Sequence, residues 1–379
     1  MSAVLEFCQS EQSWLIATIE ALVRLESPTT DKPALDECSA EIARRLQGIG
    51  ANVERVPRDD AGDHVRAEFG TGAAQVLLLC HFDTVWPVGQ LERMPLRQEA
   101  GRLYGPGTLD MKAGIAIGML AARALSETGS MPPCRIVMLL TSDEEIGSRT
   151  SRALIEREAR RSRAVLVLEP SLPGGAVKTR RKGCGEFELV VRGVAAHAGI
   201  DPGAGASAIH ELARQVLALE QLQSRERGIS VNVGTISGGT RTNVVAGEAR
   251  AGVDVRVTSL DDARRVEAAF HGLRPLLNGT TLEVSGGMDR PPLERSAGVA
   301  RLYAMARDVA VSLGLGALAE GATGGGSDGN FTAAIGTPTL DGLGATGDGA
   351  HALHEHVELA SLAGRAALVA GLIARTGAA

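Results

Sequence analysis

Two uninterrupted apolar runs, VLLLC at 76–80 and AVLVL at 164–168, constrain the fold more than any other feature of this sequence. Apolar runs without alternating polar residues are typical of strands that are covered on both faces, as in parallel sheets. Stretches with helical spacing of apolar residues alternate with these strands, which favours an α/β architecture. The expected strands are 51–56, 64–69, 75–81, 135–141 and 164–169, and the expected helices are 11–25, 34–48, 112–127 and 150–161.

The pattern changes after Glu169, where the order of elements becomes βαββαβ. This order is typical of a ferredoxin-like unit that can fold on itself. Its expected elements are strand 185–193, helix 205–222, strands 229–237 and 248–257, helix 260–274 and strand 280–285. The sequence then returns to an α/β pattern, with expected helices at 296–313 and 358–375. We therefore predict an α/β domain with a mixed, largely parallel sheet at 1–180 and 291–379, interrupted by a ferredoxin-like βαββαβ domain at 181–290.

Composition narrows the classes of partner. A chain of 379 residues with a formal net charge of −6 argues for two domains and against nucleic acid as a partner. No uninterrupted apolar run reaches the roughly 18 residues of a membrane span. The five cysteines are scattered without a C-x-x-C pair, which favours reduced thiols. The N-terminus has an early Glu6 and no basic region before an apolar core, so a secretory signal is not expected. The chain is predicted to be cytoplasmic.

Polar residues follow the buried strands directly. In HFDTV, His81 and Asp83 are two positions apart and can share one face at the end of the strand. A metal-binding histidine commonly donates its second N–H to a carboxylate, which this spacing allows. The alternative for this pair is an ordinary surface hydrogen bond.

Further carboxylates occupy comparable positions. Asp110 in GPGTLDMKAG precedes a small-residue helix, Asp143-Glu144-Glu145 follow a strand, and Glu169 is the last residue of another. Individually these residues could be a helix N-cap or strand-end charges. Together they bring acids and an imidazole to one edge of a sheet. Nitrogen and oxygen ligands without thiolate suit zinc, or cobalt or manganese. A second histidine is needed for two metals, and spacing alone does not choose among His351, His354 and His356.

The segments HFDTVW, GPGTLDMKAG, TSDEEIGS, VLEP, VAAHAG, TNVV and GGGSDGN, in this order, resemble the di-zinc aminoacylase/carboxypeptidase metallopeptidase family. The most similar type is the bacterial glutamate carboxypeptidases of the carboxypeptidase G kind. The resemblance runs from about residue 14 to 375 and implies two Zn²⁺ per subunit, for which Co²⁺ or Mn²⁺ could substitute. It implies that Glu144 is the general base and that Asp83 is the partner of His81. The implied metal ligands are His81, Asp110 as the bridge, Glu145, Glu169 and His351, the last through the match of GAHALHE to the G-x-H-x-x-x-E pattern. The resemblance also implies a cis Asp110–Met111 bond.

The resemblance implies that 1–180 and 291–379 form the catalytic α/β domain and that the ferredoxin-like unit at 181–290 is a lid and dimerisation domain. His197 would reach the active site of a partner subunit in a homodimer and stabilise the oxyanion, whereas without the resemblance it would be a loop histidine capping helix 205–222. The implied substrate-binding residues are Asn243, Arg256, Arg290, Gly325 and Gly326. For these, the alternatives are a turn former, a solvated strand charge, a hinge salt bridge and, for the glycines, a phosphate-binding loop, which lacks the Lys-Ser/Thr pair of a P-loop.

The implied reaction is hydrolysis of an amide beside a free carboxylate, releasing C-terminal glutamate from peptides or from N-acyl or folyl conjugates. The alternative within the family is an N-acyl-amino-acid deacylase of the acetylornithine deacetylase or succinyl-diaminopimelate desuccinylase type. Cys80 replaces a frequent glycine, and a lysine that some glutamate carboxypeptidases carry has no clear match. A non-catalytic binding protein should lack Glu144 or several ligands, which are all present. A thiol enzyme using Cys80 or Cys184 lacks a convincing local histidine.

Overall fold

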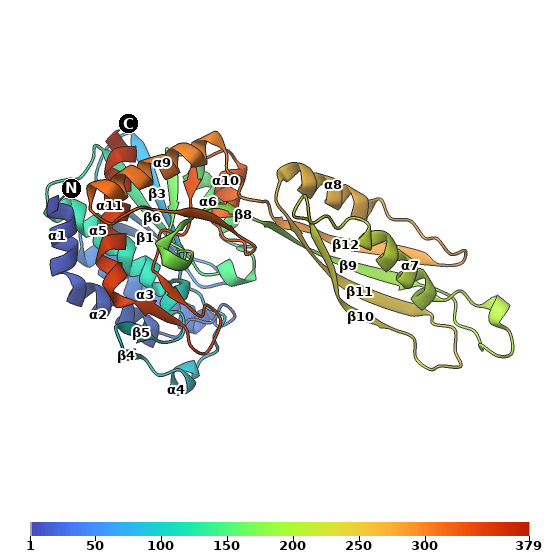
Figure 1. Ribbon diagram of the computed structural model, residues 1–379. Helices are drawn as coiled ribbons and strands as arrows, with labels where there is room; N and C mark the ends of the chain where they lie inside the picture. Colours follow the sequence, from blue (N-terminus) through green and yellow to red (C-terminus); the bar gives the residue numbers. More distant parts are fainter. Residues whose placement is uncertain (1, 379) are drawn as a thin grey trace. The chain divides into compact units, whose positions relative to one another are not determined.

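The computed structural model describes residues 2–378, and the chain divides into two compact units (Figure 1). The first unit comprises the chain up to Arg180, Arg295–Ala322 and the chain from Ser327 onward. The second comprises Arg181–Glu294 and Thr323–Gly326. The segment 181–290, predicted as a lid, therefore lies within the second unit, which continues to Glu294.

A six-stranded sheet forms the centre of the first unit, in the order β1-β2-β6-β3-β7-β14. The pairs β6–β3, β3–β7 and β7–β14 are parallel, whereas β1–β2 and β2–β6 are antiparallel. The prediction of a mixed, largely parallel sheet is confirmed. The strands are β1 (Asn52–Val56), β2 (His64–Phe69), β3 (Ala74–His81), β6 (Cys134–Thr141), β7 (Ala164–Val167) and β14 (Thr339–Leu340).

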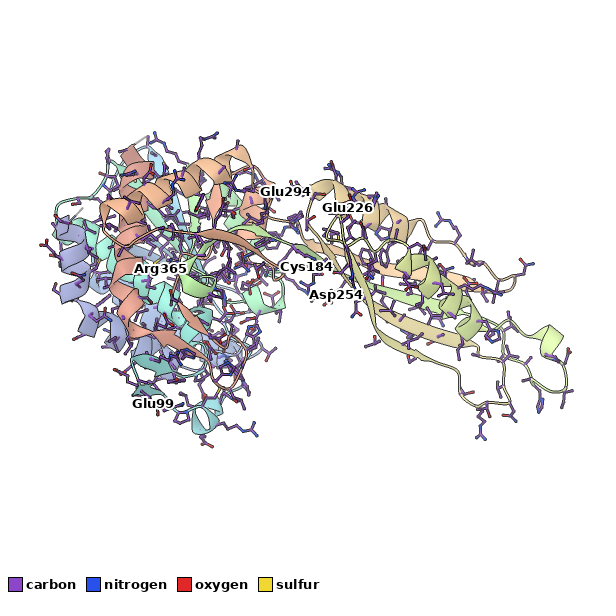
Figure 2. The ribbon with its side chains drawn as sticks, in the orientation of Figure 1. Glu99, Cys184, Glu226, Asp254, Glu294 and Arg365 are labelled. Atoms are coloured by element: carbon purple, nitrogen blue, oxygen red, sulfur yellow. The ribbon has the colours of Figure 1, made fainter. Side chains whose placement is uncertain are left out.

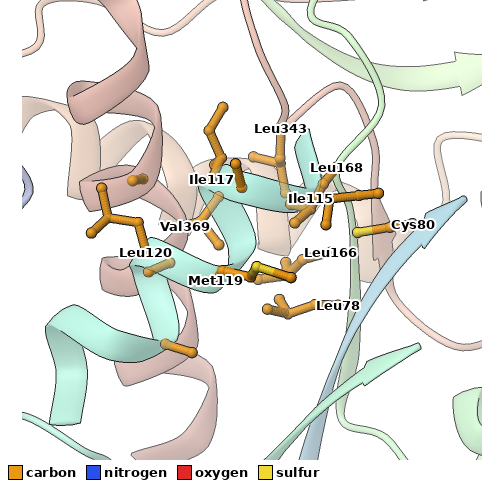
Figure 3. Close-up of a cluster of buried hydrophobic side chains, with 14 of the residues drawn as sticks. Leu78, Cys80, Ile115, Ile117, Met119, Leu120, Leu166, Leu168, Leu343 and Val369 are labelled. Carbon is orange, nitrogen blue, oxygen red and sulfur yellow. The ribbon is translucent and has the colours of Figure 1, made fainter. Parts of the chain in front are cut away.

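Helices cover both faces of this sheet, as the continuous apolar runs require. Leu78 and Cys80 of β3 point into the larger core, among side chains of α5 and α11 (Figure 3). Leu77 and Leu79 point to the opposite face, where they pack with residues of α6. The helices of this unit are α1 (Ser2–Ser10), α2 (Gln12–Arg24), α3 (Lys32–Gly48), α4 (Gln90–Arg93), α5 (Ala113–Glu127), α6 (Arg152–Arg160), α9 (Ala297–Ser312), α10 (Gly329–Ala334) and α11 (Leu362–Ala378).

Small residues let α5 approach the end of the sheet closely. A Cβ atom on Gly114 would lie 2.0 Å from the carbonyl oxygen of Leu168, and one on Gly118 would lie 2.6 Å from Leu168 Cδ1. The main-chain oxygen of Leu168 cannot move aside as the end of a side chain can, so only glycine fits at residue 114. The contact places the start of α5, and the loop before it, beside the segment that leads into Glu169.

The C-terminal stretch Leu359–Ala378 is the one helix among residues 2–378 that is long and apolar enough to cross a membrane, with a mean hydropathy of 1.3. Of its apolar 18-residue window, 67% is buried, and the helix packs against α1, α5, α9 and β3. Its buried Arg365 donates hydrogen bonds to the carbonyl oxygens of Gly344 and Gly175, each at 2.8 Å. These contacts are those of a core helix of a globular unit.

Several short elements of the first unit were not predicted. They include α1, a two-stranded pairing of β8 (Val177–Arg181) with β13 (Glu320–Thr323), and an antiparallel sheet in the order β15-β16-β5-β4. The strands of this small sheet are β4 (Arg97–Glu99), β5 (Arg102–Tyr104), β15 (Gly347–Asp348) and β16 (His356–Glu358). Strands of two or three residues are too short to show a period in the sequence.

The second unit is a four-stranded antiparallel sheet in the order β10-β11-β9-β12, with both of its long helices on one face (Figure 1). The order along the chain is βαββαβ, so the ferredoxin-like prediction is confirmed. Phe187 and Phe270 stack in its core with ring centroids 4.0 Å apart. The elements are β9 (Gly183–Arg192), α7 (Ala208–Glu220), β10 (Ser230–Gly238), β11 (Glu248–Val257), α8 (Leu260–His271) and β12 (Thr281–Arg290).

Candidate active site

The parallel strands deliver polar residues to one edge of the large sheet. β3 ends at His81, β6 ends at Thr141 just before Asp143-Glu144-Glu145, and β7 ends two residues before Glu169. Because β6, β3 and β7 are adjacent and parallel, their carboxyl ends meet at the same edge. The sequence-based expectation that these segments converge is met in the fold.

One cluster of side chains forms around His81. Its Nε2 atom lies 3.2 Å from Asp110 Oδ1 and 3.3 Å from Glu169 Oε1. His81 and Glu169 are buried, and Asp110 is half-buried. The three residues each offer one ligand atom, and these atoms lie within 4.8 Å of one another, so they could hold one metal ion.

A second cluster shares Asp110 with the first. His351 Nε2 lies 3.4 Å from Asp110 Oδ2 and 3.3 Å from Glu145 Oε1. Its ligand atoms also fall within 4.8 Å of one another. His354 and His356 do not belong to either cluster: His356 Nδ1 lies 2.9 Å from the carbonyl oxygen of His354. Of the three candidate histidines, His351 is therefore the one that lies beside Asp110 and Glu145.

Asp83 contacts one residue of each cluster, His81 and Glu145. His81 Nδ1 lies 3.1 Å from the Asp83 carbonyl oxygen and 3.4 Å from Asp83 Oδ1. The same buried carboxylate accepts hydrogen bonds from the main-chain N–H groups of Glu144, at 3.2 Å, and Glu145, at 3.1 Å. The Thr29 hydroxyl donates a further bond, at 2.8 Å. Asp83 therefore orients the imidazole and the Glu144-Glu145 turn together.

Asp110 lies in the irregular turn Thr108–Lys112 before α5. Its side chain does not cap that helix, since the N-cap position belongs to Lys112 and has no side-chain cap. Both carboxylate oxygens instead face imidazoles, one from each cluster. The Asp110–Met111 peptide bond is cis.

The carboxylates favour positive charge at both imidazoles. Burial alone would lower the pKa of His81, but contacts with Asp110, Asp83 and Glu169 raise it well above its usual value. Contacts with Asp110 and Glu145 raise the pKa of His351 to about 10. Burial favours the neutral form of Asp110, yet the two histidines hold its pKa below the ordinary range. A site that binds protons this tightly attracts cations.

The donor set fits a pair of divalent cations. Two triads of imidazole nitrogens and carboxylate oxygens share one aspartate, which is the arrangement of a two-metal site. Nitrogen and oxygen donors without thiolate fit zinc and related divalent ions. Cys80 belongs to neither triad, and burial raises the pKa of its thiol well above the usual value. Figure 3 shows Cys80 among apolar side chains, which is the environment of a structural thiol.

Glu144 and Asp328 lie at the same edge. Glu144 is half-buried and, with His81, Glu169 and Asp328, lines a small hollow. The buried Asp328 carboxylate accepts hydrogen bonds from the hydroxyls of Thr141, at 3.1 Å, and Ser148. Of the adjacent residues Glu144 and Glu145, Glu145 belongs to a metal-ligand triad and Glu144 does not.

In the second unit, the two predicted substrate-binding arginines flank Cys184. Arg256 and Arg290 pair with Cys184 from neighbouring strands, β11 and β12. Arg256 donates to Cys184 Sγ at 2.5 Å and makes two bonds with the carboxylate of Asp254, at 3.0 and 2.7 Å. Cys184 and Asp254 are labelled in Figure 2. Part of the Arg256 charge is therefore neutralised by its neighbour.

The glycine-rich loop lies beside Arg290 and Cys184. A Cβ atom on Gly326 would lie 2.9 Å from Arg290 Cδ and 3.3 Å from Cys184 Sγ, so a side chain would fill this space. Arg181 donates hydrogen bonds to the carbonyl oxygens of Gly325, at 3.2 Å, and Gly326, at 2.8 Å.

His197 and Asn243 lie on paired segments of the second unit. His197 bridges Val244, and the Ala198 N–H donates to the Asn243 carbonyl oxygen at 3.0 Å. His197 Nδ1 accepts hydrogen bonds from the main-chain N–H groups of Gly199, at 3.1 Å, and Ile200, at 3.2 Å. The alternative that His197 caps the following helix is wrong, because the Ser207 side chain caps α7.

Sequence reasoning assigned no role to Glu355, although the structure places it beneath Asp110. Its buried carboxylate accepts hydrogen bonds from Asp110 N, at 3.1 Å, and from three further N–H groups. The signal was present, since Glu355 is the last residue of the GAHALHE segment that matched G-x-H-x-x-x-E.

Comparison with known proteins gives one family. The family model for peptidase family M20/M25/M40 matches residues 77–375. Carboxypeptidase G2 of Pseudomonas sp. (strain RS-16) is 29% identical over 97% of this chain and 90% of its own length. Succinyl-diaminopimelate desuccinylase of Xanthomonas euvesicatoria pv. vesicatoria (strain 85-10) is 30% identical over 90% of this chain and 94% of its own length. A solved dinuclear metal binding peptidase from Bacillus subtilis, 15% identical, covers 97% of this chain and 98% of its own, with a TM-score of 0.71.

Proposed function

The chain belongs to peptidase family M20/M25/M40 and is a hydrolase of C–N bonds, and from this premise we propose that it cleaves an amide beside a free carboxylate and releases C-terminal glutamate from peptides or from N-acyl or folyl conjugates. The observation that carries the proposal is the pair of triads that share Asp110. The similarity to carboxypeptidase G2 over nearly the whole chain supports the choice of glutamate.

We propose zinc for both metal positions, with Co²⁺ or Mn²⁺ as substitutes. His81, Asp110 and Glu169 would hold one ion, and Asp110, Glu145 and His351 the other. Bound divalent cations supply Lewis acidity and lower the pKa of an attacking water. Asp83 supports both triads, because it contacts His81 and the main chain of Glu145.

Glu144 is proposed as the general base. Its main-chain N–H is fixed by Asp83, and Glu144 lines the same small hollow as His81 and Glu169. The carboxylate takes a proton from the attacking water as the new C–O bond forms. It then gives that proton to the leaving nitrogen as the C–N bond breaks, so that a carboxylate and an amine are released.

His197 suits a role as a hydrogen-bond donor to the oxyanion. Since its Nδ1 atom accepts two main-chain N–H bonds, the proton of the neutral ring lies on Nε2. The exposed Nε2–H group can then donate to a substrate oxygen. We propose that it serves a second copy of the chain, with Asn243 as a further substrate contact.

Arg256 and Arg290 are proposed to bind the substrate carboxylate, because a guanidinium can grip a carboxylate with two hydrogen bonds. Gly325 and Gly326 would contribute main-chain groups. Arg256 also makes two bonds with the carboxylate of Asp254, which neutralise part of its charge.

A substrate panel tests the proposed reaction. Purified protein is assayed with a folyl-glutamate, a dipeptide ending in glutamate, an N-acetyl amino acid and N-succinyl-diaminopimelate. The expected result is the highest kcat/KM for the substrates with C-terminal glutamate. Cleavage of the N-acyl amino acids alone would replace this proposal by the deacylase alternative, which the similarity to the desuccinylase supports. No cleavage of any substrate after loading with zinc would contradict both.

The second unit is proposed to form a homodimer through the edge strand β10 and helix α7. β10 is an edge of its sheet, and Ile236 on this strand is 62% exposed. Light scattering is expected to give about twice the chain mass of 39.3 kDa. Ile236→Lys should shift the protein toward monomer, since a buried unpaired lysine opposes association. Val311→Lys, at a 65% exposed site on α9 of the first unit, is the matched control and should stay dimeric. A monomeric wild-type protein contradicts the proposal.

A reducing compartment is proposed for the protein. All five cysteines are free, four of them buried and Cys184 half-buried. Reduced thiols are typical of cytoplasmic proteins, so we propose the cytoplasm.

A further inference from the structure

Glu355 is a buried carboxylate that no catalytic or metal-binding role explains. Its Oε2 atom accepts hydrogen bonds from Trp86 Nε1 and from the Gly107 N–H, both at 2.9 Å. Its Oε1 atom accepts bonds from the N–H groups of Leu109, at 2.9 Å, and Asp110, at 3.1 Å. All four donors are neutral, and the side chain is only 1% exposed. Burial of a carboxylate costs free energy unless its oxygens are satisfied, so this arrangement is a built feature of the fold.

The four hydrogen bonds fix the turn that carries Asp110. Three of them come from main-chain N–H groups between Gly107 and Asp110, and the Gly105 N–H also donates to the Glu355 carbonyl oxygen at 3.3 Å. The turn is anchored along most of its length by one residue of the C-terminal segment. The orientation of the shared Asp110 carboxylate therefore depends on Glu355.

The same residue closes the loop that carries His351. The Glu355 N–H donates to the Ala352 carbonyl oxygen at 2.9 Å, and the Ala352 N–H donates to the Gly349 carbonyl oxygen at 2.8 Å. His351 lies in this turn with a positive φ of 61°. Glu355 thus connects two of the three residues of the second triad, Asp110 and His351.

The first triad has other supports. His81 is the last residue of β3, which pairs with β6 and β7, and its ring is held by Asp83. Glu169 follows β7, and its carbonyl oxygen accepts a bond from the Gly344 N–H at 2.9 Å. Of this triad only Asp110 depends on Glu355. The loss of Glu355 should therefore affect the two triads unequally.

We propose that Glu355 is a positioning residue that assembles the Asp110–Glu145–His351 metal site by fixing the Asp110 turn and the His351 loop to each other. This inference rests on the proposed two-metal function. Removing a residue that orients metal ligands typically lowers metal affinity by 10- to 100-fold. We expect that loss at the second triad and a change of less than about threefold at the first.

Glu355→Gln is the informative substitution. Its size is unchanged, but the amide NH₂ must face two of the four N–H donors in either orientation of the side chain. The full-length protein is stripped with a chelator and titrated with Zn²⁺ by calorimetry, and Co²⁺ absorption spectra record the coordination of each ion. The wild type is expected to bind two ions per chain, whereas the variant should bind one with normal affinity and the second about 10- to 100-fold more weakly.

Two further variants complete the test. Glu358→Gln, at an exposed position three residues along the chain, is the matched control and should bind both ions as the wild type does. Trp86→Phe removes one of the four donors and leaves the carboxylate, so it should weaken the second ion by a few-fold, and it replaces E355Q as the test if that protein does not fold.

The outcomes separate the inference from the function on which it rests. Equal weakening of both ions, or two wild-type affinities in E355Q, overturns the role of Glu355. Fewer than two ions on the wild-type chain instead overturns the proposed two-metal site.

Discussion

Glu144→Gln is expected to lower kcat by about 10²- to 10⁴-fold, the usual contribution of general acid–base catalysis. Glutamine has the size of glutamate but cannot take a proton from water at neutral pH. The main chain at residue 144 should stay in place, because Asp83 holds it through the N–H group. Because Glu144 lies outside both triads, the variant should still bind two metal ions, and KM should change little. Steady-state kinetics and metal analysis of the same preparation measure the three quantities.

The control for this experiment is Glu156→Gln on α6. Glu156 pairs with Arg152 and Arg160 on the helix surface, and such pairs contribute little to stability. Its kcat should equal that of the wild type. A Glu144→Gln protein that keeps both its metal and its full kcat would show that another group is the base.

Removal of the metal is expected to abolish activity, with a fall in kcat of about 10³-fold or more. Lewis-acid catalysis is worth several kcal/mol, and each 1.36 kcal/mol corresponds to a factor of ten. Dialysis against a chelator followed by addition of Zn²⁺ should restore the rate, and the thermal unfolding midpoint should rise with it, because an ion that binds only the folded state stabilises that state. Full activity of protein shown by analysis to be free of metal would contradict the proposal.

The histidines of the C-terminal segment provide matched variants for the metal experiment. His351→Ala removes a residue of the second triad and should reduce the content from two ions to one. His354→Ala should leave two ions bound, since His354 belongs to neither triad. Identical metal contents for these two variants would remove His351 from the proposed ligand set.

Five of the six strands of the large sheet could be predicted because their signal is local, whereas the two-residue β14 was not predicted. Runs such as VLLLC are long, and their ends carry His81 and Glu169 within one or two residues, so their convergence follows from parallel pairing alone. The small sheet β15-β16-β5-β4 could not be predicted, because its strands have two or three residues and pair segments about 250 residues apart along the chain.

The candidate site likewise contains residues that could be predicted from the sequence and residues that could not. The acids at the strand ends could be found by their position, whereas the choice of His351 needed the family resemblance. Glu355 was missed because its function is to satisfy main-chain N–H groups of a turn that lies 245 residues earlier. Partners of this kind leave no periodic pattern in a single sequence.

The contact between Gly114 and Leu168 carries a consequence for mutational screens. A methyl group at residue 114 would overlap the Leu168 carbonyl, and the displaced chain leads directly into Glu169. A substitution far from any reacting atom would then shift a ligand-bearing carboxylate, and a colony assay would score it like the loss of a ligand. Selection for catalytic activity in this protein therefore also preserves a glycine in α5, at residue 114.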